Sequence, residues 1–399
     1  MSSRVFAGRW VFPVGGPPLA NGTVSVRGER IESVDPHGAR SQDHDLGNVA
    51  IVPGLVNSHT HLDLSGARGV IAPTDADHCT DWLQSVIAFR RSRSPEQVQA
   101  DIIAGLAECL NSGTTLIGDI AAAGASWTAL TQAKTRSMAF FELIGLTADR
   151  AGQSLEAGRQ WFESREETAN VRAGISPHAP YSTRSELFAA AGQLVRPKKR
   201  PLALHLAEWP SEIELLHNHR GPLAEFLKKL NAWDPSGPFA SDGAAMKAVD
   251  FRQPKLFIHG NHLAPTARIP RNSTIVFCPR THAAFGHPPH PFREFLRRGI
   301  RVCLGTDSLA SNPDLDLLAE ARYVHGRHPD LPGDVLLKMV TLFGAESLGW
   351  SNEAGSLEAG RSADFVAIPL PDRDAADPHD LLFADYPGVR RTMFRGQWR

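Results

Sequence analysis

Eight short apolar runs alternate with helical segments through the middle of the chain, and this alternation constrains the fold more than any other feature. The runs are 54–62, 114–120, 137–145, 171–179, 202–208, 255–263, 274–281 and 302–310. Amphipathic segments lie between several of them, at 95–113, 185–197 and 291–299. Strands that alternate with helices indicate a parallel sheet, and eight such units over about 300 residues predict an α/β fold, the closed (β/α)8 barrel of the TIM type.

An open, doubly wound parallel sheet is the alternative architecture. That fold usually carries a G-x-G-x-x-G sequence after an early strand, where it binds a dinucleotide. No such sequence follows any early run of this chain. The pattern therefore favours the barrel.

Both ends of the chain have a different, all-β character. The segment "GTVSVRGERIESV" (22–34) has two alternating runs around a tight turn, which is typical of a β-hairpin. Similar runs return in "GSLEAGRSADFVAIPL" (355–370) and "GVRRTMFRGQWR" (388–399). We therefore expect a small β-sandwich domain built from both termini, residues 1–52 plus 353–399, beside a barrel of residues 53–352.

Charge and composition narrow the classes of partner and location. The formal net charge is -1, so neither nucleic acid nor a membrane surface is an expected partner. No stretch approaches the roughly 20 apolar residues that cross a bilayer, and the N-terminus lacks the apolar core of a signal peptide. The 4 cysteines are scattered without a C-x-x-C pair, as in reducing compartments. We expect a cytoplasmic protein with a small-molecule substrate, and homo-oligomer formation stays open.

Histidine is abundant, with 17 residues, and several stand where a barrel carries its chemistry. In "VNSHTHLDLSG" (56–66), His59 and His61 are two residues apart on a predicted strand, so their side chains point the same way. Active sites of TIM barrels lie at the carboxyl ends of the strands. Ionisable residues gather at the predicted ends: His59, His61, His178, His205, Glu208, His259 and Asp307.

Imidazole and carboxylate groups together suit Zn²⁺ or Fe²⁺. Such an ion lowers the pKa of a bound water to about 7 and so produces a hydroxide nucleophile. Glu208, three residues after His205, is placed to carry a proton from that water to a leaving group. Asp307 can bind the metal and hold the hydroxide, and His259 can polarise the substrate. His262 is a weaker candidate, since it points to the opposite face of its run.

Six segments together resemble one known family. They are "VPGLVNSHTHLD", "SPHAPYS", "LHLAE", "IHGNHL", "LGTDSLASN" and "GSLEAGRSADFV". These segments resemble the amidohydrolase superfamily, in its cytosine-deaminase-like branch. That branch includes guanine deaminase, S-adenosylhomocysteine/methylthioadenosine deaminase, aminodeoxyfutalosine deaminase and the triazine chlorohydrolases. The resemblance covers nearly the whole chain.

The resemblance implies the roles of individual residues. It makes His59, His61, His205 and Asp307 the ligands of one divalent ion, with Zn²⁺ preferred and Fe²⁺ as the alternative. It matches Glu208 to the acid/base glutamate of the deaminases, and His259 and His178 to positions that contact substrate. Binuclear members carry a carboxylated lysine at the end of strand four. The run 171–179 contains no lysine, which indicates a single ion.

Two features depart from the family pattern or stand outside it. The stretch "CPRTHAAFGHPPHP" (278–291) replaces the more usual "CP-x-SN", so Arg280, His282 and the Pro-rich loop are candidates for shaping the pocket. The loop between Arg280 and His290 can instead serve packing alone. Trp82 in "TDWLQ" is a candidate for stacking on a planar substrate ring, although packing in the barrel explains it as well.

These observations predict a metal-dependent hydrolase that acts on non-peptide C–N bonds. The preferred reaction is hydrolytic deamination of an amino-substituted heteroaromatic ring by the metal-activated hydroxide. By analogy, the substrate is purine nucleoside-like, of the aminodeoxyfutalosine or thioadenosine type. An alternative is removal of chloride or an alkylamine from a triazine-like ring. A more remote alternative is a catalytically inactive barrel that serves as a scaffold.

Overall fold

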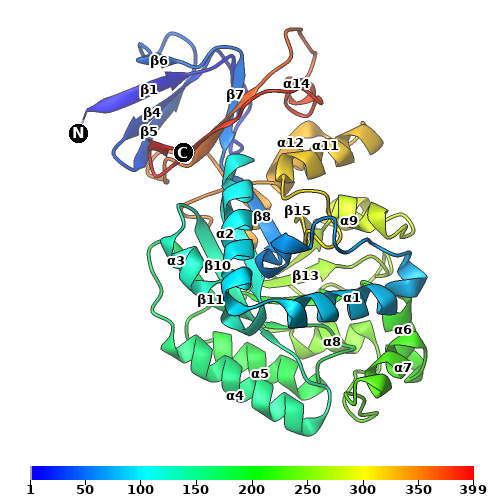
Figure 1. The fold of residues 1–399 in the computed structure, drawn as a ribbon. Helices are drawn as coiled ribbons and strands as arrows, with labels where there is room; N and C mark the ends of the chain where they lie inside the picture. The colour runs from blue at the N-terminus through cyan, green and yellow to red at the C-terminus, as the bar shows by residue number, and fades with distance from the viewer. Residues whose placement is uncertain (1) are drawn as a thin grey trace.

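The computed structural model describes residues 2–399 and contains an eight-stranded parallel sheet that curves into a barrel (Figure 1). The strands follow one another in chain order around the sheet. They are β8 (Leu55–Thr60), β9 (Thr114–Ala121), β10 (Arg136–Leu143), β11 (Val171–Pro177), β12 (Leu202–Leu206), β13 (Lys255–His259), β14 (Ser273–Phe277) and β15 (Arg301–Leu304).

The sheet closes between its first and last strands. Thr60 and Asp307 form an isolated parallel bridge, and the N–H of Asp307 donates to the carbonyl of His59 over 3.1 Å. The eight strands and their closure confirm the predicted (β/α)8 barrel. Each predicted run overlaps one of them.

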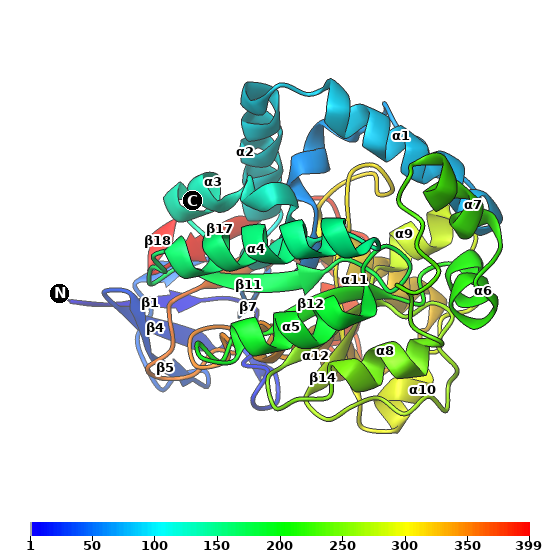
Figure 2. The same cartoon turned by 90° about the horizontal axis from the view of Figure 1, so that it is seen from below.

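Helices cover the outside of the barrel. In the view from below, α4 and α5 lie against β11 and β12 (Figure 2). The helices are α1 (Cys79–Ser92), α2 (Pro95–Asn111), α3 (Trp127–Gln132), α4 (Ala148–Ser164), α5 (Ser185–Val195), α6 (Pro210–Asn218), α7 (Pro222–Lys229), α8 (Asp242–Ala248), α9 (Pro279–Ala284), α10 (Phe292–Arg297), α11 (Leu317–Arg327), α12 (Gly333–Met339), α13 (Leu342–Ser347) and α14 (His379–Leu382). None of the helices described is long and apolar enough to cross a membrane.

The start of α2 shows how the local sequence fixes a helix end. Ser94 accepts a hydrogen bond from the N–H of Gln97, and the Gln97 side chain accepts one from the N–H of Ser94. This capping box satisfies N–H groups that have no partner within the helix. Pro95 occupies the first helical position, where its missing N–H costs nothing.

Two smaller sheets are built from both termini and lie together at one end of the barrel (Figure 1). One has the order β5-β4-β1-β6, and the other β18-β17-β16-β7-β2-β3. The strands are β1 (Ser3–Ala7), β2 (Trp10–Val11), β3 (Leu19–Ala20), β4 (Thr23–Arg27), β5 (Arg30–Asp35), β6 (His44–Asp45), β7 (Val49–Pro53), β16 (Phe365–Pro369), β17 (Arg391–Phe394) and β18 (Gln397–Trp398). β4 and β5 form the predicted hairpin.

The two ends of the chain meet in this region. β16 pairs antiparallel with β7, so that Phe365 lies opposite Pro53. Side chains from both sheets share one buried cluster, which includes Phe6, Val24, Ile51 and Phe365. This arrangement confirms a small sandwich made from the termini. The boundaries at 52/53 and 352/353 stay a prediction.

The passage from the sandwich into the barrel is a single residue, Gly54, between β7 and β8. A Cβ atom on Gly54 would lie 2.0 Å from Oγ1 of Thr115, which real Cβ atoms do not approach. Glycine is therefore required where the chain enters the barrel. This close approach also fixes β8 against β9, the first pair of strands in the ring.

Candidate active site

Three histidines and an aspartate meet at the carboxyl ends of β8, β12 and β15. Nε2 of His61 lies 3.3 Å from Nε2 of His205. Oδ1 of Asp307 lies 3.3 Å from Nε2 of His59 and 3.7 Å from Nε2 of His61. Donor atoms around a tetrahedral zinc ion, each at about 2.1 Å, are separated by roughly 3.4 Å. His59, His61 and His205 therefore lie close enough together to hold one divalent ion, and His59 and Asp307 form a second, overlapping triad with His259.

The hydrogen-bond partners of these residues support the same conclusion. Both ring nitrogens of His59 and Nδ1 of His61 are buried and make no hydrogen bond within residues 2–399. Nδ1 of His205 lies 3.0 Å from the carbonyl oxygen of His178, which places its proton there and leaves Nε2 free to bind metal. The hydroxyl of Ser311 donates to Oδ2 of Asp307 over 3.0 Å. The Nε2 atoms of His59, His61 and His205 thus face the centre of the group.

The protonation states also suit a metal. Burial lowers the pKa of His61 and of His205 well below its ordinary value, and the neighbouring histidines lower it further. Burial by itself would raise the pKa of Asp307, but close contact with His59 and nearby imidazoles hold that pKa below its usual range. Metal ligands of these types bind as neutral imidazole and ionised carboxylate. His61, His205 and Asp307 therefore have the required charges at neutral pH.

A second pair of groups, Glu208 and His259, lies beside these residues. Oε1 of Glu208 is 3.4 Å from Nε2 of His259, and both side chains are buried. Burial raises the pKa of Glu208 well above its ordinary value, and the charge of Asp307 adds to the effect. Burial lowers the pKa of His259 to about 3. The raised pKa of Glu208 favours its protonated carboxyl and the lowered pKa of His259 favours the neutral imidazole, a combination that suits proton transfer.

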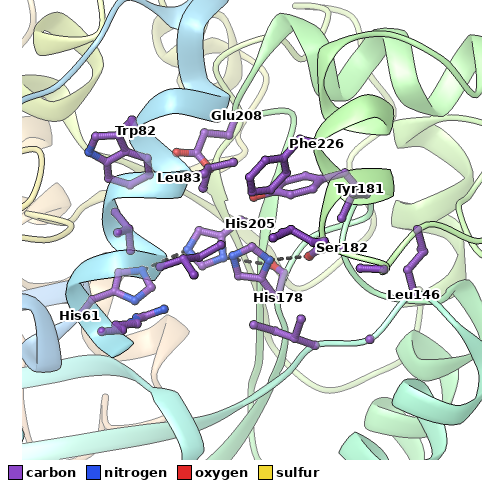
Figure 3. A pocket seen from close by; sticks show the side chains of 18 of the residues that line it. His61, Trp82, Leu83, Leu146, His178, Tyr181, Ser182, His205, Glu208 and Phe226 are labelled. Carbon is purple, nitrogen blue, oxygen red and sulfur yellow. Dashed lines mark hydrogen bonds between the residues drawn. The ribbon is translucent and has the colours of Figure 1, made fainter. Parts of the chain in front are cut away.

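The pocket that opens from these residues has largely apolar walls (Figure 3). Trp82 and Leu83 come from α1, Ile144 and Leu146 follow β10, and Phe226 and Leu230 come from α7 and its end. His61, His205, Glu208 and Asp307 line the inner end of the same pocket. A planar ring with apolar substituents fits such walls, with its reactive carbon turned toward the ionisable groups.

Two of the three predicted substrate contacts line this pocket. Nδ1 of His178 lies 2.5 Å from the hydroxyl of Ser182. The indole N–H of Trp82 donates to the carbonyl of Ala310 over 3.1 Å, which fixes the ring in the wall. Both residues are therefore placed to contact a ligand. Their roles stay predictions.

Arg280, the third predicted contact, does not line the pocket. Its guanidinium is bound by two carboxylates, with Nη2 2.6 Å from Asp314 and Nε 2.7 Å from Glu320. Arg280 stands on α9, and these two ion pairs connect it to α11 and to the segment directly before α11. The geometry gives no support to a substrate contact and favours the packing interpretation of this residue.

The rest of the histidine-rich loop has a mixed role. Nε2 of His282 lies 2.9 Å from the carbonyl oxygen of Pro288. Nε2 of His262 lies 3.2 Å from Nδ1 of His287, so the hydrogen bonds of these rings stay within the loop and its neighbour His262. Nε2 of His290, in contrast, lies 2.8 Å from the carbonyl oxygen of His259. The loop therefore supports the backbone of one site residue, although it does not line the pocket.

Several residues of the site were not predicted from the sequence. The apolar wall formed by Phe226 and Leu230 lies on the connection between β12 and β13, where no motif indicated a role. Tyr181 and Ser182 also line the pocket, and both stand in the quoted segment "SPHAPYS". Buried Glu142, at the end of β10, was also missed. Its carboxylate, His178 and His205 form a further group close enough to hold an ion.

Comparisons with known proteins agree with this geometry. The sequence profile described as "Amidohydrolase family" matches residues 50–399. A protein of Nitratidesulfovibrio vulgaris named 5-methylthioadenosine/S-adenosylhomocysteine deaminase is 30% identical over 408 residues, which cover 98% of this chain and 88% of that protein.

Two solved structures share the fold at lower sequence identity. The aminofutalosine deaminase of Helicobacter pylori, in complex with methylthio-coformycin, superposes with a TM-score of 0.86 at 19% identity, covering 99% of this chain and 100% of the other. The atrazine chlorohydrolase of Arthrobacter aurescens, complexed with zinc, gives a TM-score of 0.77 at 22% identity, covering 99% and 94%. Both resemblances extend over the sandwich as well as the barrel.

Proposed function

The chain belongs to the amidohydrolase family, and from this premise we propose that it is a hydrolase that releases ammonia from an amino-substituted heteroaromatic ring. One observation carries the proposal: the carboxyl of Glu208 lies 3.4 Å from the imidazole of His259, and His259 belongs to one of two overlapping triads that are close enough to hold a metal. A proton donor and a metal side by side are what displacement of a poor leaving group requires.

We propose that His59, His61, His205 and Asp307 hold one divalent ion, with Zn²⁺ preferred. When bound, the ion supplies a Lewis acid that lowers the pKa of water toward about 7. Two observations support a single ion. β11 contains no lysine that could bridge two metals, and Nδ1 of His205 is bonded to the carbonyl of His178, so only Nε2 is free.

Each remaining residue of the site then has a definite task. Glu208 carries both protons of the attacking water: it passes one to the ring nitrogen and the other to the departing amino group, which leaves as ammonia. His259 faces Glu208 and donates or accepts a hydrogen bond at the atom where charge develops. Trp82 and Phe226 hold the plane of the ring, and the apolar walls exclude water from the reacting carbon.

The substrate we prefer is an adenine nucleoside with an apolar 5′ substituent. The deaminase of Nitratidesulfovibrio vulgaris is named for 5-methylthioadenosine, and the Helicobacter pylori structure holds a methylthio ligand. Ile144, Leu146 and Leu230, which line the pocket together with Arg150, supply an apolar surface for such a substituent. The location we propose for this enzyme is the cytoplasm.

The competing function is displacement of chloride or an alkylamine from a triazine, because apolar walls suit alkyl substituents too. The raised pKa of Glu208 favours ammonia or an alkylamine over chloride, since chloride leaves without a proton while an amine needs one. A screen of ammonia and chloride release separates the two. The panel is 5′-methylthioadenosine, S-adenosylhomocysteine, adenosine, guanine, cytosine, and amino- and chlorotriazines. Ammonia release from the adenine compounds supports the proposal, and chloride release alone overturns it.

A further inference from the structure

Glu212 is a buried carboxylate that the proposed chemistry does not use. It lies in the first turn of α6, four residues after Glu208, and its side chain is 0% exposed. Its hydrogen-bond partners are backbone N–H groups: Oε1 accepts from Ala207 over 3.1 Å and Oε2 from Glu208 over 3.0 Å. Within residues 2–399 no cation stabilises it. Since a buried carboxylate is costly without partners, its two oxygens are committed to this turn.

The turn that Glu212 binds has an unfavourable backbone conformation. β12 ends at Leu206 and α6 begins at Pro210, so three residues make the connection. Ala207 has a φ of 51°, in the left-handed region that residues with a Cβ seldom occupy. Such a conformation persists only where surrounding contacts stabilise it. The two hydrogen bonds to Glu212 are contacts of this kind.

The same turn is tied to the end of the neighbouring strand, β13. The side-chain amide of Asn261 donates to the carbonyl of Glu208 over 3.2 Å, and the N–H of His262 donates to the carbonyl of Ala207 over 2.9 Å. The turn with Glu208 and the turn after His259 therefore form one unit. Its geometry sets the separation between the Glu208 and His259 side chains.

We propose that Glu212 is a positioning residue, which fixes the backbone at Ala207 and Glu208 so that the Glu208 carboxyl faces His259. This inference rests on the proposed function, because it assigns Glu212 its effect through the proton transfer by Glu208. Glu212 itself does not line the pocket and contacts no reacting atom.

The test compares Glu212→Ala, Glu212→Gln and the control Glu214→Gln in the metal-loaded enzyme. Glu214 stands on the same helix, with its side chain 41% exposed. Loss of both N–H acceptors misplaces Glu208, and a displacement of about 1 Å costs about 10²-fold in rate. Glu212→Ala should therefore lower kcat by about that factor with little change in KM. Glu212→Gln keeps one carbonyl acceptor and should recover part of kcat. Glu214→Gln should match the wild type.

Two readouts separate positioning from general stabilisation. The pH profile of kcat should shift in Glu212→Ala, because the surroundings of the Glu208 carboxyl change, whereas the metal content should stay constant. Amide hydrogen exchange at Ala207 and Glu208 should increase, and a crystal structure of the variant should show a longer distance from Glu208 to His259. If Glu212→Ala does not fold, the same measurements on Glu212→Gln decide the question.

The outcomes also distinguish this inference from the proposed function. If the wild type releases no ammonia from any compound of the panel, the proposed function is wrong, while hydrogen exchange and the crystal structure still test the positioning. If the wild type is active and both Glu212 variants keep its kcat and pH profile, the inference is wrong and the proposed function stands. Unchanged exchange at Ala207 and Glu208 in both variants would also overturn it.

Discussion

Nε2 of His259 lies 3.4 Å from Oε1 of Glu208, and the backbone that carries each side chain passes through a left-handed residue. Ala207, directly before Glu208, has a φ of 51°, and His259 itself has a φ of 68°. Asp307 is a third case, with a φ of 59°. Strained backbone of this kind is maintained by neighbouring contacts and is concentrated at functional sites. The barrel thus positions Glu208 and His259 through left-handed residues at the ends of its strands.

The first prediction concerns this pair. Glu208→Gln should keep the metal, since Glu208 is not among the proposed ligands, but it removes the proton that the carboxyl supplies. General acid–base groups contribute about 10²–10⁴-fold, so kcat should fall by that range with a smaller change in KM. Steady-state kinetics and metal analysis on one preparation check this. Metal loss together with activity would make Glu208 a ligand, and near-wild-type turnover would exclude it from the mechanism.

The second prediction concerns the metal. The wild type should carry about one Zn²⁺ or Fe²⁺ per chain, because the two triads of potential ligands share His59 and so overlap at one place. His61→Ala should lose both the ion and the activity. His262→Ala is the matched control, since His262 bonds to His287 outside the group. Elemental analysis measures the metal content of each protein directly. A fully active protein without a transition metal would contradict the proposal, and two ions per chain would point to Glu142 and His178 as additional ligands.

The third prediction concerns the pocket wall. Phe226→Ala should raise KM for 5′-methylthioadenosine and leave kcat nearly unchanged, because Phe226 lines the pocket on the side away from the metal ligands (Figure 3). Removing a large aromatic contact typically costs about 1–3 kcal/mol of binding, or roughly ten- to a hundredfold in KM. Competition experiments with a non-reactive analogue check the effect on affinity. An unchanged KM would place the substrate on another wall.

How far the sequence alone could predict this site depends on where each residue stands. Four residues were recognisable from the sequence: His59, His61, His205 and Asp307. Each stands at the carboxyl end of a predicted strand, and parallel strands of a barrel bring these ends together at one edge. Arg280 could not be placed in this way, since its orientation depends on Asp314 and on Glu320, 40 residues further along the chain.

Phe226 and Glu212 were missed for related reasons. Phe226 lies on a helix in the connection between β12 and β13, and connections of this type vary freely without a pattern of their own. Glu212 looks like an ordinary acidic residue of a helical first turn. Its role follows only from two backbone N–H groups that the turn at Ala207 directs toward it. Backbone conformation at single residues is not encoded in a local pattern.

The fourth prediction concerns the composite sandwich. Phe365 of β16 packs edge-on against Phe6 of β1 and Trp398 of β18, with ring centroids 5.7 Å and 5.5 Å apart. Phe365→Ala should lower the free energy of unfolding by about 3–5 kcal/mol, as expected for a fully buried aromatic ring. Val389→Ala is the control from the same terminal segment, because Val389 is 86% exposed. Urea unfolding measures both variants. Equal stabilities would show that the termini do not share a core.

The last prediction concerns pH. Burial lowers the pKa of three histidines in the loop 279–291: to about 4 for His282, about 2 for His287 and about 3 for His290. The unfolded chain binds protons at these side chains near their ordinary value of 6.5, whereas the folded chain does not. The free energy of unfolding therefore has its full value above about pH 6.5. It falls as the pH drops below that value, by up to about 2 kcal/mol per histidine at about pH 5.

A double variant, His282→Gln with His287→Gln, should narrow the difference in unfolding free energy between about pH 7.5 and about pH 5, because two of the three proton-binding groups are removed. His37→Gln is the control, since His37 is exposed on the sandwich. Urea titrations at both pH values measure the difference in unfolding free energy for the wild type, the double variant and the control. Loss of metal in acid affects these three proteins alike. A double variant with the same pH dependence as the wild type would show that these histidines already bind protons in the folded chain.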